Sequence, residues 1–69
     1  MSRLKLLGKN IKKFREQKKL SQEKLAELVD LSREYVVRVE NGCKRISLKK
    51  LFEIADVLEV KCSDLVDFE

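Results

Sequence analysis

The sequence predicts an all-α fold, and three observations carry this prediction. Apolar residues recur at intervals of three and four along most of the chain, which is the period of an amphipathic helix. Serines stand before several of these stretches, where a serine side chain caps the amino end of a helix. Proline is absent and there are two glycines, so few residues interrupt the helices. We therefore expect a single helical domain over residues 1–69.

Two amphipathic segments make up the amino-terminal part of the chain. The first is expected to end near Lys19, and one of its faces carries Leu4, Leu7, Ile11 and Phe14. Gly8 lies inside this helix and should cost it about 1 kcal/mol relative to alanine. Ser21 is expected to cap a second, short helix whose buried stripe is marked by Leu25 and Leu28.

Only about three residues separate this second helix from a third, which is too short a link for anything but a tight turn. Ser32 is the expected N-cap of the third helix, and Val36 and Val39 form its inward face. Gly42 follows as a left-handed cap. Two helices joined in this way indicate a helix-turn-helix unit over about residues 21–41; by spacing alone the alternative is another small helical bundle, many of which also have short turns.

Two further helices are expected in the carboxyl-terminal part. Ser47 caps the fourth helix, whose apolar positions are Leu48, Leu51, Ala55 and Leu58. Residues 62–68 predict a weaker fifth helix with Leu65 pointing inward.

The charge of the chain is unevenly distributed. The net charge is +4, and residues 1–19 contain eight lysines or arginines against Glu16 alone. Lys44, Arg45, Lys49 and Lys50 form a second basic cluster, whereas six acids oppose Lys61 from residue 51 onward. The folded protein should therefore have a basic and an acidic side, which is typical of proteins that bind a polyanion. The alternative is that these charged side chains only form solvent-exposed helix faces and bind no partner.

Several classes of function are excluded by composition. There is no histidine, so Cys43 and Cys62 match neither common zinc-ligand spacings nor a Cys/His nucleophile, and we expect both to be free thiols. A glycine-rich phosphate loop is also missing, so we expect no enzyme, no metal and no cofactor. No apolar run is long enough to cross a membrane and no signal-peptide pattern is present, so we expect a cytoplasmic protein.

Three motifs occur in an order and spacing that indicate a family. They are LSQEKLA at 20–26, the pattern S-x-x-Y-V-x-x-V-E-N-G at 32–42, and IADVL at 54–58. The stretch from Leu7 to Leu65 thereby resembles the lambda repressor and Cro-type helix-turn-helix family, also called the xenobiotic-response-element family. This resemblance implies a five-helix all-α domain whose third helix, residues 32–41, enters the major groove of double-stranded DNA.

The sequence departs from the family pattern at four positions. Asp30 stands where glycine is usual in the turn of the helix-turn-helix unit, and aspartate tolerates the left-handed conformation better than most residues. Ile46 replaces a frequent proline, and Cys43 replaces a common basic residue. Val37 replaces a small polar residue on the side of the third helix that contacts DNA bases in the family, which makes the preferred DNA sequence hard to infer.

The candidate base-contacting residues lie on the outward face of the third helix. At about 100° per residue they fall opposite the two inward valines, and the family's base-contacting positions map onto the same four: Arg33, Glu34, Val37 and Arg38. Arginine can donate two hydrogen bonds to guanine and glutamate can accept one from cytosine, so we expect a G·C pair in each half-site. The alternatives are that Arg38 is only a solvated side chain and that Glu34 only interacts with the helix dipole and orients Arg38.

Contacts to DNA phosphates are expected around this helix. The candidates are Ser21 and Gln22 at the amino end of the second helix, and Tyr35, Asn41, Lys44 and Arg45 in and after the third. For Tyr35 the alternative is a packing role, and for Asn41 it is a role as a turn residue. The family also pairs an arginine of the first helix with the glutamate of the E-N-G motif, which implies a structural ion pair between Arg15 and Glu40.

We expect the protein to act as a homodimer on an inverted repeat, because four side chains on one short helix supply little specificity alone. The resemblance implies an interface near the carboxyl end, where Val60, Cys62, Val66 and Phe68 exceed what one small core needs; alternatively, they complete the monomer core. Half-site centres should lie about 10–10.5 base pairs apart.

The functional hypothesis is a sequence-specific transcriptional regulator: a phage-type repressor, a controller protein of a restriction-modification system, or a regulator of a mobile element. The alternative is an antitoxin-like protein-interaction module that binds DNA secondarily. The sequence also leaves open RNA polymerase or a regulatory protein as a further partner.

Overall fold

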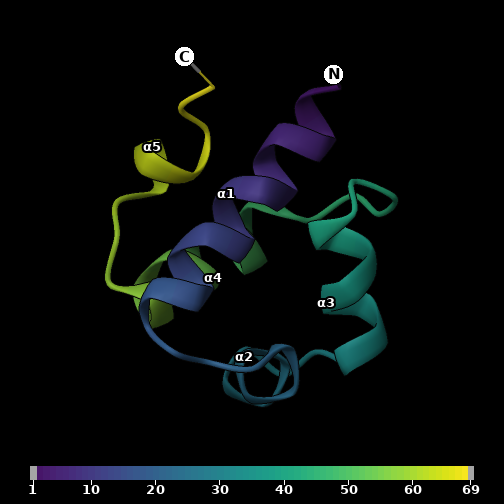
Figure 1. Cartoon of the computed structure of the whole chain (residues 1–69), viewed down its shortest axis with the longest axis vertical. Helices are drawn as coiled ribbons and strands as arrows, with labels where there is room; N and C mark the ends of the chain where they lie inside the picture. The colour runs from purple at the N-terminus through teal and green to yellow at the C-terminus, as the bar shows by residue number, and fades with distance from the viewer. Residues whose placement is uncertain (1, 69) are drawn as a thin grey trace.

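The computed structural model describes residues 2–68, and these residues form five α-helices and no strand, which confirms the predicted all-α fold (Figure 1). In chain order the helices are α1 (Arg3–Gln17), α2 (Gln22–Leu28), α3 (Arg33–Glu40), α4 (Leu48–Leu58) and α5 (Cys62–Leu65). Within the same residues, none of the helices is both long and apolar enough to cross a membrane.

Serine caps begin the helices where the sequence predicts them. The hydroxyl oxygens of Ser21, Ser32 and Ser47 accept hydrogen bonds of 2.9, 3.0 and 3.2 Å from the backbone N–H three residues later. Ser2 caps α1 in the same way, which the sequence analysis did not predict. Each hydroxyl satisfies one of the backbone donors that the first turn of a helix leaves without an intrahelical partner.

Left-handed residues close the turns on both sides of α3. Asp30, in the turn between α2 and α3, has φ 56°, and Gly42, which follows α3, has φ 75°. Both conformations are the ones predicted at these positions. Aspartate takes the place of a glycine in the first turn because its short polar side chain tolerates this region.

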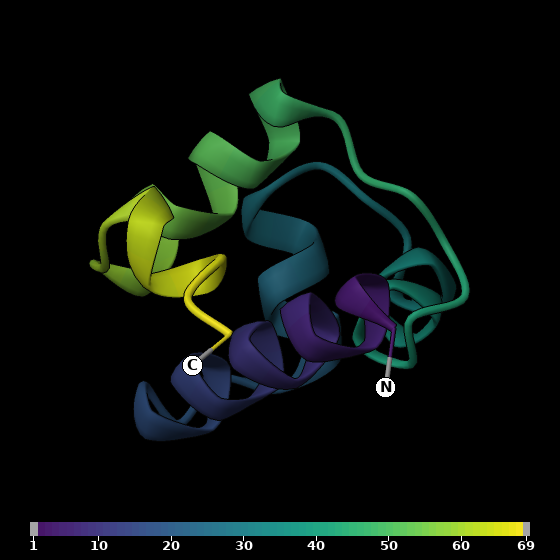
Figure 2. The same cartoon turned by 90° about the horizontal axis from the view of Figure 1, so that it is seen from above.

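The five helices surround one core. α1 contacts α3, α4 and α5, and α2 contacts α3 and α4. Figure 2 shows α1 along one side of the molecule, with α3 at one end of it and α5 at the other. The side chains with less than 2 % exposure at the centre are Ile11, Leu25, Ile54, Leu58, Leu65 and Val29. The arrangement leaves the outer face of α3 free of other helices.

Three apolar side chains expected in the core are exposed instead. Leu4, Leu28 and Leu48 are 38 %, 48 % and 68 % exposed. The buried face of α2 is formed by Leu25 and Ala26 and continues to Val29, which follows the helix as its C-cap; Leu28 lies about 110° around the helix from the centre of this face. Leu4 and Leu48 lie in the first turns of α1 and α4. Neighbouring helices cover the later turns of α1 and α4, so side chains in the first turns stay exposed.

The fifth helix is shorter than predicted. It ends at Leu65 rather than Phe68, although Leu65 is fully buried as expected. The side-chain amide of Asn10 donates hydrogen bonds to the carbonyl oxygens of Leu65 and Asp67, at 2.9 and 3.0 Å. These bonds hold residues 66–68 against α1 in a non-helical conformation.

α1 and α3 approach each other closely at Gly8. A Cβ atom added to Gly8 would lie 2.3 Å from the carbonyl oxygen of Glu40 and 2.5 Å from that of Val39. This contact gives a physical reason for a glycine inside α1, because any side chain there would separate the two helices. It also sets the position of the carboxyl end of α3.

Candidate nucleic-acid interface

The outward face of α3 carries polar side chains on a helix that is anchored by its other face. Val36 and Val39 are 2 % and 4 % exposed, and Glu40 is buried beside them. The predicted base-contacting residues Arg33, Glu34 and Arg38 are all exposed, and Val37 is half-buried at the edge of the same face. The structure therefore brings these four side chains together on one side of a fixed helix.

The loop after α3 lies beside this face. A shallow hollow is lined by Ser32, Glu34, Tyr35, Arg38 and Lys44, so candidate base and phosphate contacts adjoin one another. The Lys44 ammonium lies 5.4 Å from the centre of the Tyr35 ring, within range of a cation–π interaction. Asn41, Lys44 and Arg45 are exposed.

Tyr35 connects the helix to this loop. Its hydroxyl donates a hydrogen bond of 2.9 Å to the carbonyl oxygen of Arg45. A phosphate accepts hydrogen bonds and donates none, so the single hydroxyl proton cannot serve the phosphate while it serves Arg45. This geometry favours the packing role of Tyr35 over a direct phosphate contact.

A buried polar network joins the first three helices. The Arg15 guanidinium donates to both carboxylate oxygens of Glu40, at 2.7 and 3.1 Å, and to the carbonyl oxygen of Leu20 at 2.8 Å. The Gln22 side-chain amide donates to Glu40 as well, at 3.0 Å. The hydrogen bond to Glu40 raises the pKa of Arg15 above its ordinary value, against the opposing effect of burial.

Gln22 therefore has a neighbour that the sequence did not indicate. Its Nε2 atom is held by a carboxylate that Arg15 also holds, so the side chain is positioned before any ligand arrives. Gln22 is half-buried, and Ser21 beside it is exposed but uses its hydroxyl oxygen to cap α2. Sequence spacing cannot reveal such a contact, because the two partners lie 18 residues apart.

The basic and acidic segments are less separated than the charge pattern predicts. Lys18 pairs with Glu59, and this ion pair lowers the pKa of the exposed Glu59 carboxyl. Lys13 lines a pocket that also contains Asp64 and Asp67. Acidic residues from the carboxyl-terminal part of the chain therefore lie beside Lys13 of α1 and beside Lys18, which follows α1.

The residues expected at a dimer interface have different environments. Val66 is 44 % exposed, whereas Val60, Cys62 and Phe68 are half-buried and pack against the core. Sequence reasoning missed two more exposed apolar side chains, Leu48 at 68 % and Phe52 at 52 %, which lie one turn apart on α4. Helical spacing sets Phe52 apart from the buried positions of α4, whereas Leu48 has the spacing of a core residue and gave no such signal.

Both cysteines are free thiols, as predicted, with Cys43 exposed and Cys62 half-buried. Within residues 2–68 no group of three or more potential ligand side chains is placed to hold a metal ion.

Two helices crossing through a tight turn, with the second presenting a polar face, define a helix-turn-helix protein. A helix-turn-helix family model matches residues 11–65. The chain belongs to this family, the lambda repressor and Cro-type helix-turn-helix proteins.

Proteins similar to this chain are regulators. The control protein C.BamHI of Bacillus amyloliquefaciens is 39 % identical over 64 residues, which cover 91 % of this chain and 79 % of that protein. The crystal structure of the restriction-modification controller protein C.AhdI of Aeromonas hydrophila has a TM-score of 0.86 and 37 % identity, over 90 % of this chain and 94 % of that one. SinR, a master regulator for biofilm formation solved in complex with DNA, has a TM-score of 0.83 and 29 % identity, over 88 % of this chain and 98 % of that one.

Proposed function

We propose that this protein is a sequence-specific, double-stranded-DNA-binding regulator of transcription of the controller type. The observation that carries the proposal is the face of α3 on which Arg33, Glu34 and Arg38 are exposed while Val36 and Val39 anchor the helix. A helix held in this way can enter the major groove without losing its packing. The similarity to C.AhdI and to the DNA-bound SinR supports the same conclusion.

Each outward side chain of α3 has a chemical role in this proposal. Arginine donates two hydrogen bonds to guanine O6 and N7, glutamate accepts one from cytosine N4, and a valine methyl can contact a thymine methyl. Arg33, Arg38, Glu34 and Val37 supply these groups. Phosphate contacts come from the surrounding residues Ser21, Gln22, Asn41, Lys44 and Arg45.

The proposed function is tested by selecting bound duplexes from a random pool and measuring their affinity by fluorescence anisotropy. We expect the selected duplexes to share an inverted repeat with a G·C pair in each half, and to bind more tightly than scrambled duplexes of the same length. A protein that binds all duplexes equally, or none, is not a sequence-specific regulator.

Arg38→Ala is expected to separate specificity from general affinity. The loss of a bidentate contact to guanine should cost about 1–3 kcal/mol on the selected site and relax the preference at one base pair, with little change on random DNA. Arg3→Ala is the matched control, because Arg3 is an exposed arginine in the first turn of α1. Equal losses on selected and random duplexes would place Arg38 on a phosphate instead.

We further propose that the working unit is a twofold homodimer. The large apolar side chains left exposed on α4 and after α5, namely Leu48, Phe52 and Val66, are what a second copy of the chain would cover. Figure 2 shows α4 and α5 next to each other. Val60, Cys62 and Phe68 are half-buried and pack against the core of the monomer.

Spacing between half-sites tests the dimer directly. Because the two reading helices must meet the same side of the duplex about 10–10.5 base pairs apart, inserting five base pairs should reduce the affinity to that of a single half-site. Phe52→Glu should shift the protein toward monomers in sedimentation experiments and have the same effect on binding. Unchanged affinity after the insertion would contradict a rigid dimer on an inverted repeat.

A further inference from the structure

A strip of lysines runs along one side of α1. Lys5, Lys9 and Lys12 follow one another at spacings of four and three residues, so they lie on one side of the helix. All three are exposed, and among residues 2–68 none of them forms an ion pair. We call these three residues the α1 basic strip; Glu16 is the one acid in the same helix.

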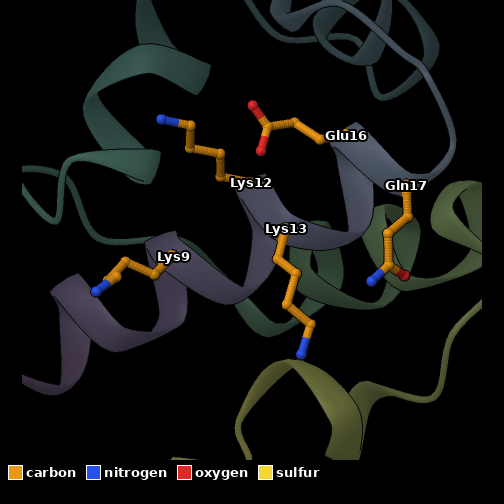
Figure 3. Close-up of a pocket in the computed structure, with 5 residues that line it drawn as sticks. All are labelled: Lys9, Lys12, Lys13, Glu16 and Gln17. Carbon is orange, nitrogen blue, oxygen red and sulfur yellow. The ribbon is translucent and has the colours of Figure 1, made fainter.

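The strip lies on the side of α1 that adjoins the reading helix. At its first residue, a Cβ atom added to Gly42 would lie 2.8 Å from the Cα of Lys5, so the strip begins against the loop that follows α3. Figure 3 shows Lys12 extending toward α3 and Lys9 extending along the amino-terminal part of α1, whereas Lys13 points toward α5. The strip is therefore continuous with the loop that carries Lys44 and Arg45.

We propose that the α1 basic strip binds phosphates of the DNA duplex in addition to those contacted by the helix-turn-helix unit and its following loop. This inference rests on the proposed DNA-binding function. Glu16 lies one turn beyond Lys12 on the same side of the helix, but none of the three ammonium groups is held in one of the ion pairs described above. Such exposed ammonium groups at helical spacing are suited to a regular anionic backbone. A protein partner would instead need an apolar centre, and the exposed large apolar side chains lie mostly on α4 and after α5.

The number of phosphate contacts is measurable through the salt dependence of binding. Each phosphate that a lysine neutralises releases counterions, which adds about −0.9 to the slope of log affinity against log salt concentration. Three lysines on phosphates would therefore contribute about −2.7 to that slope. They would do so on any sequence, because phosphates carry no base identity.

The test compares two variants with the same change in net charge. The strip variant combines Lys5→Gln, Lys9→Gln and Lys12→Gln. The control variant combines Lys13→Gln, Lys18→Gln and Lys61→Gln, whose side chains lie outside the strip; Lys18 pairs with Glu59. Both are titrated on the selected operator at several salt concentrations, after circular dichroism and thermal melting have shown that they are folded.

We expect the strip variant to bind with a slope that is less steep by about 2–3, and the control variant to match the wild type. Ethylation interference should reveal phosphates whose modification weakens the wild type and not the strip variant. If the strip variant has the slope and the interference pattern of the wild type, the inference about the α1 basic strip is wrong, although the proposed function is not affected. The same holds if the slope changes equally in the strip variant and the control variant. A wild-type protein that binds no DNA overturns the proposed function itself.

Discussion

Glu40→Ala is expected to destabilise the protein by about 3–5 kcal/mol, because it leaves the buried Arg15 guanidinium without its carboxylate. Arg15 and Glu40 are 7 % and 6 % exposed, and after the substitution Arg15 would keep only its bond to the Leu20 carbonyl oxygen. Stabilities of native domains amount to roughly 0.05–0.15 kcal/mol per residue, or about 3–10 kcal/mol for a chain of this length. The expected loss is therefore a large part of the total, and urea denaturation measures it.

Two comparisons show whether burial is the cause. Glu27→Ala removes one partner of the exposed Lys24–Glu27 pair and should change stability by less than about 1 kcal/mol. The double variant Arg15→Met with Glu40→Leu removes both buried charges and should recover much of the stability lost by Glu40→Ala, since no charge is left unpaired. If Glu27→Ala and Glu40→Ala cost the same, the Arg15–Glu40 pair is not a buried pair in solution.

Gly8→Ala is expected to destabilise the protein, whereas a glycine-to-alanine substitution inside a helix usually stabilises one. Helix propensity alone would favour alanine by about 1 kcal/mol. Here the new methyl would lie 2.3 Å from the Glu40 carbonyl oxygen and 2.5 Å from that of Val39, and both obstacles are backbone atoms that cannot rotate away. Overpacking of this kind costs about 1–3 kcal/mol and occasionally more, so we expect a net loss at the upper end of that range.

The same substitution should weaken DNA binding beyond its effect on folding. Separating α1 from the carboxyl end of α3 should shift α3 relative to the loop that follows it, which begins at Gly42. Thermal melting measures the stability, and anisotropy titration below the melting transition measures the affinity. Gln17→Ala, at an exposed position of the same helix, is the control and should change stability by no more than about 0.5 kcal/mol. A Gly8→Ala protein as stable as the wild type would contradict the close approach of α1 and α3.

Local signals allowed most of the fold and the outward face of α3 to be predicted. Serine caps at Ser21, Ser32 and Ser47 depend on a hydrogen bond three residues away, and the left-handed cap at Gly42 depends on one residue. Such features involve short stretches of chain, so a single sequence contains the necessary information. The two faces of α3 likewise follow from helical spacing alone.

Contacts between helices account for what could not be predicted. Leu4 and Leu48 have the spacing of core residues and are exposed, because burial depends on whether another helix covers that turn. The bond that holds Gln22 on Glu40 joins residues distant in sequence, as does the bond by which Asn10 ends α5.

The sequence by itself therefore determined the helices, their caps, the helix-turn-helix unit and the residue types on the reading face, all of which arise from interactions within a few residues. Only the tertiary structure decided which apolar side chains remain exposed, why residue 8 is glycine, and that the α1 basic strip begins against the loop that follows α3. The physical reason is that these properties depend on how whole helices pack, and the helical period of the sequence does not encode which neighbour covers each face.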